Sequence, residues 1–129
     1  MTKAMLAVVL ALGGCATLTD PTTSREYTGL YASGFEVEGF VPCGTDESWW
    51  VTEGEELRER YGEVATRPYE AVYVVVRGAV GPEGRYGHLG AYPHEIAVSD
   101  VVEIRPARPG ECDGSLPATM AVHQRRETI

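Results

Sequence analysis

Three cysteines and three histidines are the side chains of this sequence best suited to covalent or metal chemistry. The cysteines are Cys15, Cys43 and Cys112, and none belongs to a CxxC pair. The histidines, at positions 88, 94 and 123, lack the paired spacing of a zinc site. The sequence has no GxSxG motif and no glycine-rich phosphate loop. We therefore expect a protein that is not an enzyme, with no catalytic residue, no bound metal and no cofactor.

The first 14 residues have the parts of a secretion signal. Lys3 supplies a positive charge, positions 4–12 form the apolar run AMLAVVLAL, and Gly13 and Gly14 precede Cys15. This run is too short to cross a bilayer as a helix, which takes about 20 residues. Residues 1–14 are therefore predicted to be a signal peptide that is removed on export.

The four residues Leu12 to Cys15 resemble the lipobox of bacterial lipoproteins. The resemblance implies that Cys15 receives diacylglycerol, becomes the new N-terminus and is acylated with a fatty acid such as palmitate. Two or more chains anchor a protein stably to a membrane. Ala16 stands where an aspartate would favour the inner membrane of Gram-negative bacteria, so the predicted location is the outer membrane, facing the periplasm.

With Cys15 lipidated, Cys43 and Cys112 remain as an even pair in a compartment that permits disulfides. A bridge would close a loop of about 70 residues and stabilise the fold by about 4 kcal/mol on the chain-entropy model. Metal ligation by these two cysteines is the less favoured alternative.

The charge balance limits the partners of the mature chain. Lys3 is the only lysine, so removal of the signal leaves 115 residues with ten arginines against 19 carboxylates, a formal charge of −9. This acidity argues against nucleic acid as a partner, because phosphate binding needs clustered cations. It also provides no polybasic membrane patch. The lipid on Cys15 is therefore the predicted membrane contact.

The mature chain is long enough for one domain. Residues 15–25 are mostly small and polar, which indicates a tether, and residues 113–129 are expected to be a flexible C-terminal tail. The folded domain is therefore predicted to span residues 26–112.

The first clear strand pattern lies in residues 35–41. Apolar side chains recur at every second position, at Phe35, Val37 and Val41. Glu36 and Glu38 alternate with them, as in a half-buried strand whose acidic side chains face solvent. Phe40 breaks the phase beside Gly39, which indicates a bulge. Another strand is predicted from the sequence SWWV at residues 48–51.

A single short helix is predicted after this strand. Thr52 and Glu55 have the spacing of a capping box, with Thr52 as the N-cap. Leu57 and Tyr61 share one face and must pack on something, because a helix this short is marginal alone. Gly62 is the expected C-cap.

Two further strands follow the helix. The run YEAVYVVVRGAV at residues 69–80 places four valines on one face, at positions 72, 74, 76 and 80. Residues 81–84 form a turn, and residues 85–92 are expected to return as a hairpin arm. In the last strand, EIAVSDVVEIRP at residues 95–106, the side chains in phase are Ile96, Val98, Val102 and Ile104.

The order of strands, one helix and further strands predicts a mainly β fold. It matches a small OB-like barrel of five to six strands with one short helix between the third and fourth strands. A two-layer α+β sheet is the alternative.

The segment from Phe35 to about Pro106 resembles the OB-like domain of NlpE-type envelope lipoproteins. The matching features are GFEVEGFVPCG followed by ESWWV, a short helix, EAVYVVVRGAV, and a late strand with a nearby cysteine. The resemblance implies an OB-like fold. NlpE-type proteins are implicated in copper resistance and in signalling envelope stress. The CxxC of their other domain has no counterpart in this sequence, so copper handling does not transfer.

Aromatic and polar side chains provide candidates for partner binding. Trp49 and Trp50 point to opposite faces of a strand. Packing in the core or under other residues is expected for both, and an exposed Trp50 would be a typical partner anchor. The glycine-rich residues 81–94 are either an ordinary hairpin or a recognition loop. The candidate partner-binding residues are Trp50, Arg85, Tyr86, His88 and His94.

These features favour a lipid-anchored, non-catalytic binding or structural module of the cell envelope, with a possible part in the envelope stress response. The segments 43–50 and 81–94 would face a protein or glycan partner. One alternative is an inhibitor of a lytic enzyme such as lysozyme, because an acidic domain suits a basic enzyme. Another is a metal-sensing protein that uses His88, His94 and His123.

Overall fold

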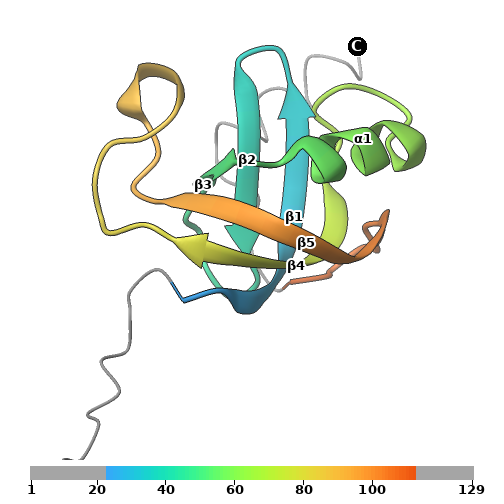
Figure 1. Cartoon of the computed structure of the whole chain (residues 1–129). Coiled ribbons are helices and arrows are strands. Elements are labelled where there is room, and N and C mark those ends of the chain that lie inside the picture. Colours follow the sequence, from blue (N-terminus) through green and yellow to red (C-terminus); the bar gives the residue numbers. More distant parts are fainter. Residues whose placement is uncertain (1–22, 113–129) are drawn as a thin grey trace, which may run out of the picture.

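The computed structural model describes residues 23–112, which form five strands, one α-helix and one short 3-10 turn (Figure 1). The strands are β1 (Arg25–Gly34), β2 (Val37–Pro42), β3 (Trp49–Thr52), β4 (Val72–Val80) and β5 (Glu95–Pro106). Helix α1 (Glu55–Val64) follows β3, and the turn η1 (His88–Gly90) lies between β4 and β5. The predicted signal peptide, Cys15, most of the predicted tether, His123 and the predicted tail lie outside the described residues.

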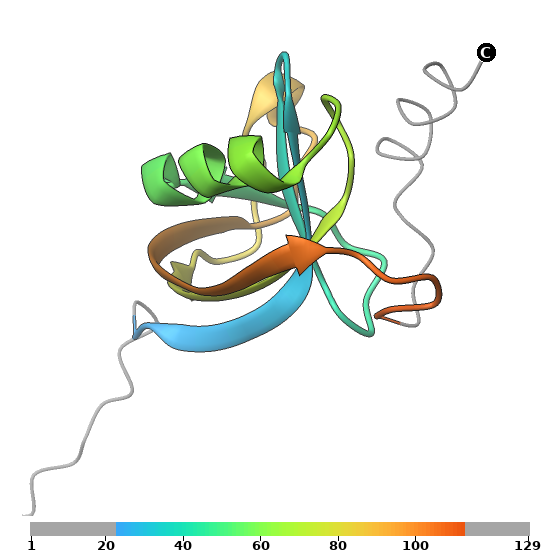
Figure 2. The ribbon, with the colours of Figure 1, turned by 90° about the vertical axis from the view of Figure 1, so that its right-hand side faces the viewer.

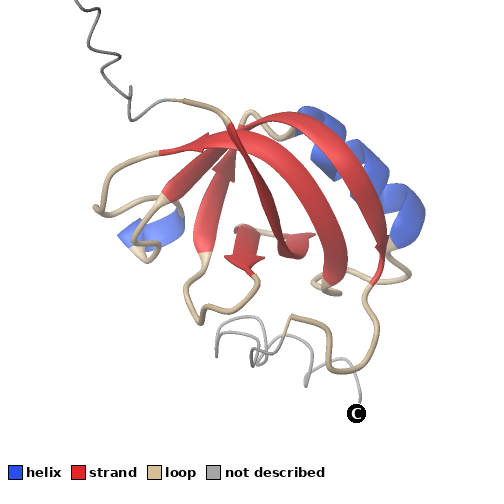
Figure 3. Cartoon of the chain, turned by 90° about the horizontal axis from the view of Figure 1, so that it is seen from below, coloured by secondary structure: helices blue, strands red, loops and turns tan. Residues whose placement is uncertain are grey.

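The strands close into a barrel in the order β1-β2-β3-β5-β4, since β4 also pairs with β1 (Figure 3). β3 and β5 are parallel, and the other neighbouring strands are antiparallel. α1 connects the third strand to the fourth. The predicted mainly β, OB-like barrel is therefore confirmed, and the alternative of a two-layer sheet is wrong.

The core fills the barrel between β4 and α1. Val72, Val74 and Val76 share the inner face of β4, as predicted, and each is at most 1% exposed. Leu57 and Tyr61 of α1 are both buried in the same cluster. α1 lies across the barrel against β5 and β1 (Figure 2), so the apolar edge of this short helix closes one side of the core.

β1 is a strand that the sequence pattern did not reveal. It starts at Arg25, the last residue of the predicted tether. Leu30, Tyr31 and Ala32 are buried in succession, with Tyr31 in the main core and Ala32 in a second cluster with Val41. Both faces of β1 are covered at this point, and two-sided burial removes the alternation by which a half-buried strand is recognised.

The phase predicted for β2 is wrong. Phe40 lies in the core with 0% exposure, and Glu38, two residues earlier, is also buried. Val41 packs on the other face, and the register between β1 and β2 runs without the predicted bulge. Phe35 is outside the strand, in the turn between β1 and β2, where it is 79% exposed. Glu38 faces inward because Tyr31 and Arg58 provide partners for its carboxylate.

The predicted helix boundaries and one strand phase also need correction. Thr52 is the last residue of β3, and the N-cap of α1 is Gly54, with no side-chain capping bond. Gly62 lies within α1, which ends at Val64. Register shifts between β4 and β5 change the phase of β5, so that Val101 is buried and Val102 is 45% exposed.

The predicted hairpin arm at residues 85–92 is a loop. Within it, one isolated bridge joins Tyr86 to Tyr92, and η1 lies between these two residues. The chain next becomes a strand at Glu95. The loop and the β1–β2 turn project at the same end of the barrel, at the top of Figure 1.

Candidate functional site

A groove lies between the β1–β2 turn and the loop that contains η1. Its volume is about 350 Å³. The lining residues come from the turn, from the starts of β2 and β3, and from the loop: Phe35, Glu36, Val37, Ser48, His88, Leu89, Ala91 and Tyr92. We call it the Phe35–Leu89 groove. In OB folds, the face of strands 2 and 3 and the adjoining loops is where ligands bind.

Two large apolar side chains stand exposed at the groove. Phe35 is 79% exposed and Leu89 is 83% exposed. Glu36 and Leu89 both have left-handed backbone conformations, with φ of 57° and 56°. Such conformations are costly for residues other than glycine and cluster at binding sites. The backbone thus holds apolar surface in water on both walls of the groove.

Aromatic contacts fix the loop against the barrel. The ring of Trp50 lies 5.2 Å from that of Tyr92, edge to face. Gly87, with φ of 68°, fits against the same indole, and a Cβ there would lie 2.4 Å from the Trp50 ring. Tyr86 donates its hydroxyl to the Pro82 carbonyl at 2.8 Å. Trp50 and Tyr86 therefore support the loop that forms one wall of the groove.

Ser48 is a lining residue with an unusual hydroxyl. Its Oγ is buried, and among the described residues it has no hydrogen-bond partner. Leaving a buried polar atom unpaired costs roughly 1–3 kcal/mol. Such atoms are few in native proteins. The hydroxyl therefore has unused hydrogen-bonding capacity beside the groove.

The two histidines of the loop have different surroundings. Nε2 of His88 lies 3.5 Å from Oε2 of Glu36, so this pair links the loop to the β1–β2 turn when His88 is protonated. Nδ1 of His94 lies 3.0 Å from the Gly81 carbonyl, and its ring packs on Trp49. Of these two histidines, His88 lines the groove and His94 does not.

The structure brings some of the predicted partner-binding residues together. His88 lines the groove, and Trp50 and Tyr86 support it. Arg85 is exposed beside Gly90 and does not line the groove.

The tryptophans pack as expected. The ring of Trp49 lies 5.5 Å from Tyr27 and 5.9 Å from Phe40, whereas Trp50 is covered by the loop. Sequence reasoning did not name Phe35, Ser48 or Leu89, although Ser48 and Leu89 lie in the segments 43–50 and 81–94 that it expected to face a partner. A signal was available for Phe35, because a large apolar residue after Gly34 at a chain reversal is uncommon.

A second buried polar cluster lies inside the barrel beneath α1. Tyr31 donates its hydroxyl to Oε1 of Glu38 at 3.0 Å, and Arg58 lies 3.5 Å from Oε2. Burial raises the pKa of Glu38, although the Tyr31 hydrogen bond and the Arg58 charge oppose the rise. A Cβ on Gly54 would lie 2.7 Å from Val51 and 3.0 Å from Glu38. The Glu38 carboxylate is buried and has partners for both of its oxygens, so we assign this cluster a structural role.

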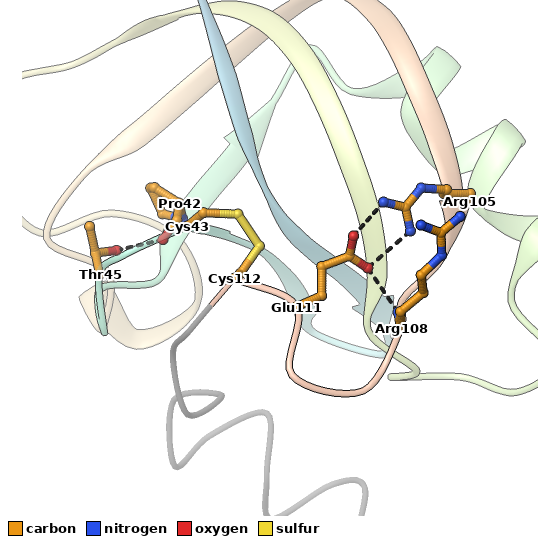
Figure 4. The surroundings of a disulfide bond; sticks show 7 residues. All are labelled: Pro42, Cys43, Thr45, Arg105, Arg108, Glu111 and Cys112. Carbon is orange, nitrogen blue, oxygen red and sulfur yellow. Dashed lines mark hydrogen bonds and ion pairs between the residues drawn. A yellow bond between two sulfur atoms is a disulfide. The ribbon is translucent and has the colours of Figure 1, made fainter.

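The disulfide expected from the cysteine count is present between Cys43 and Cys112, whose Cα atoms are 4.4 Å apart (Figure 4). Arg105 forms an ion pair with Glu111, and the backbone N–H of Arg108 donates to the same carboxylate at 2.8 Å. The hydrogen bond from Arg105 is the main reason that the pKa of Glu111 falls to about 2. These contacts fold the segment after β5 back to Cys43.

Within residues 23–112, no three His, Cys, Asp or Glu side chains are grouped to hold a metal ion. Across the same residues, α1 and the other helical segment are too short or too polar to traverse a bilayer.

Comparison with known proteins identifies the family. The sequence profile of the NlpE C-terminal OB domain matches residues 21–113. The crystal structure of the Cpx pathway activator NlpE from Escherichia coli is similar, with 18% sequence identity and a TM-score of 0.56 over 88% of this chain. The match covers 54% of the NlpE chain, so the present chain spans about half the length of that relative. No curated protein matches the sequence. The predicted resemblance is confirmed: this chain belongs to the NlpE C-terminal OB domain family.

Proposed function

We propose that this protein is a lipid-anchored, non-catalytic envelope lipoprotein that binds a protein partner through the Phe35–Leu89 groove and takes part in signalling envelope stress. The groove carries the proposal, because it combines exposed Phe35 and Leu89 with the unpaired Ser48 hydroxyl on the ligand-binding face of an OB fold. The family and the NlpE likeness support the envelope and stress role.

The position of the groove favours a protein over the membrane as its ligand. The chain enters β1 at Arg25, at the bottom of Figure 1, and the groove lies at the far end of the same strand. Ten residues of strand span roughly 33 Å. The predicted tether would therefore join the barrel at the end remote from the groove. The apolar lining also suits a protein side chain better than a glycan, which needs many polar contacts.

Crosslinking in intact cells tests the binding role. A photoreactive residue at position 89 should give a discrete protein adduct, whereas one at position 102 on β5, which is also exposed, should not. The adduct should weaken when Phe35 is replaced by serine. Equal adducts at positions 89 and 102, or none at 89, would contradict the proposed site.

Metabolic labelling with palmitate tests the anchor independently. The wild-type chain should take up label and the Cys15→Ser variant should not. A reporter of envelope stress in the same cells should respond to overproduction of the wild-type protein and respond less to the Phe35→Ser variant. Unlabelled wild-type protein would refute lipidation while leaving the groove untouched.

Inhibition of a basic lytic enzyme is a second candidate, favoured by one observation. Glu36 lines the groove, and within residues 23–112 no arginine or lysine does. Lysozyme activity should then fall in the presence of the protein, and the Glu36→Gln variant should inhibit less. Unchanged lysozyme activity at saturating protein would remove this candidate.

A further inference from the structure

We infer that the Phe35–Leu89 groove recognises a protein segment in which an apolar side chain is flanked by arginine or lysine. The inference rests on the proposed partner-binding function and specifies the chemistry of the partner. It follows from three properties of the groove: its apolar walls, the signs of the charges around it, and the Ser48 hydroxyl.

The walls select an apolar side chain. Phe35 and Val37 form one side, and Leu89, Ala91 and Tyr92 form the other. Phe35 and Leu89 are the most exposed large apolar side chains of the described residues. A partner side chain between them would remove apolar surface from water on both molecules, which is the main driving force for association.

The charges select cationic neighbours. Glu36 lines the groove at the β1–β2 turn, and its side chain is 52% exposed. The exposed residues Asp46 and Glu47 directly precede Ser48 along the chain without lining the groove, and Glu47 accepts a hydrogen bond from the Trp49 indole. Nε2 of His88 lies 3.5 Å from Oε2 of Glu36, and Arg85 lies beside the loop without lining the groove. Glu36 is thus the acidic group of the groove itself, and a cation beside the partner's apolar anchor would complement it.

Ser48 provides a polar contact within the apolar centre. Its buried Oγ lacks a partner among residues 23–112, so it would donate to a backbone carbonyl of the bound segment if binding exposes this atom. A site that hydrogen-bonds one group of a ligand discriminates against ligands without that group. Ser48 would therefore fix the position of the anchor rather than supply most of the affinity.

Other occupants fit the groove less well. A second copy of this chain is also acidic, with a formal charge of −9 after removal of the signal, and would be repelled. Nucleic acid is excluded on the same ground. Residues 113–129 of the chain itself contain apolar residues followed by Arg125 and Arg126, so their removal is part of the test.

Selection from a random peptide library on the full-length, detergent-solubilised protein tests the inference. The enriched peptides should share an apolar residue next to arginine or lysine. Glu36→Gln and Leu89→Ala should each weaken binding of an enriched peptide by about tenfold, the change typical of losing an anchor contact. The matched controls on β5, Glu103→Gln and Val102→Ala, should leave it unchanged. Binding should also weaken as salt rises.

Three results would overturn the inference. The first is enrichment of acidic or uncharged peptides, and the second is an equal loss in the Glu103→Gln control. The third is clearly tighter binding of the enriched peptides after removal of residues 113–129, which would make the chain's own terminus the occupant. If crosslinking at position 89 succeeds and selection yields no cationic motif, only the inference about partner chemistry fails. If both experiments give nothing, the proposed binding site fails as well.

Discussion

Glu38 and Ser48 are two buried polar groups in neighbouring parts of the barrel, and they differ in what surrounds them. Glu38 on β2 receives a hydrogen bond from Tyr31 and lies beside Arg58. Ser48, just before β3, has a buried hydroxyl without a partner in the described part of the chain. The first group belongs to a closed interior and the second to an open groove. The difference indicates that the region beneath α1 maintains the fold, whereas the Phe35–Leu89 groove is where we propose that a ligand binds.

The largest effect that separates the two regions should come from two leucines. Leu57 of α1 is fully buried, whereas Leu89 of η1 is 83% exposed. Leu57→Ala should lower the free energy of unfolding by about 2–5 kcal/mol, because it removes buried methyl groups and leaves a cavity. Leu89→Ala should change it by less than about 0.5 kcal/mol. Urea unfolding, followed by tryptophan fluorescence, measures both variants. A comparable loss of unfolding free energy in Leu89→Ala would contradict the distinction between the two regions.

Removing the carboxylate beneath α1 should have the next largest effect. Glu38→Ala leaves the Tyr31 hydroxyl buried without its acceptor, which costs about 1–3 kcal/mol of unfolding free energy. Glu55→Ala is a suitable control, because its carboxylate is 82% exposed and also lies near Arg58. Equal stability of the two variants would show that the interior cluster contributes little.

The same carboxylate should give a pH dependence with a defined sign. Burial raises the pKa of Glu38 above its ordinary 4.5 in the folded state, so the folded protein binds the proton more tightly than the unfolded chain. The associated stability is complete below pH 4.5 and is lost as the pH rises through the folded-state pKa. Relative to Glu38→Gln, the wild type should therefore lose stability as the pH rises above this value. A constant difference between the two proteins would contradict the raised pKa.

Ser48→Ala should not lower the free energy of unfolding, in contrast to Leu57→Ala and Glu38→Ala. Because the hydroxyl has no partner to lose, its removal should leave the free energy of unfolding unchanged or raise it by up to about 1 kcal/mol. Thr45→Ala is the matched control, since the Thr45 hydroxyl donates to the Pro42 carbonyl at 2.9 Å. That variant should lose about 0.5–1.5 kcal/mol. If Ser48→Ala proved the more destabilising, Ser48 would belong with the structural groups.

The smallest effect should come from the ion pair across the groove. His88→Ala breaks a half-exposed contact with Glu36, which is worth about 1 kcal/mol at most. Stability should therefore hardly change, while Glu36 becomes free to meet a cationic partner. Binding of cationic peptides should stay the same or strengthen. Weaker binding would show that His88 itself contacts the partner.

The sequence predicted the barrel well where one face of a strand is buried and the other is not. The valines of β4 and the Leu57–Tyr61 pair of α1 follow simple periods, and both sets lie where the pattern placed them. β1 was missed because successive residues are buried on both of its faces. The local sequence pattern cannot show that segments distant in the sequence will bury both faces of a strand.

The errors in β2 and β5 have the same physical origin. An acidic residue at position 38 is expected to face solvent unless partners are known, and its partners Tyr31 and Arg58 come from β1 and α1. Val101 is buried in place of the predicted Val102 because the register between β4 and β5 shifts. These shifts depend on how two distant strands pair in the barrel.

The glycines and aromatic residues of the sequence were enough to locate the loop that forms one wall of the candidate site. They were not enough to identify Leu89 and Ser48 as key groups of that site. Leu89 would be expected to be buried on composition alone, and its left-handed backbone is visible only in the fold. The missing partner of Ser48 is a property of the whole structure, because every neighbour must be known before a hydroxyl can be called unpaired.

Closure of the barrel limits how this protein can associate with others. Within residues 23–112, each strand has a neighbour on both sides, although β2 pairs with β3 over only two residues. A free strand edge is what lets one chain extend the sheet of another and aggregate. Copies held on one membrane by the proposed lipid anchor would meet at high local concentration, and a barrel in which every described strand has two neighbours would leave recognition between them mainly to side chains.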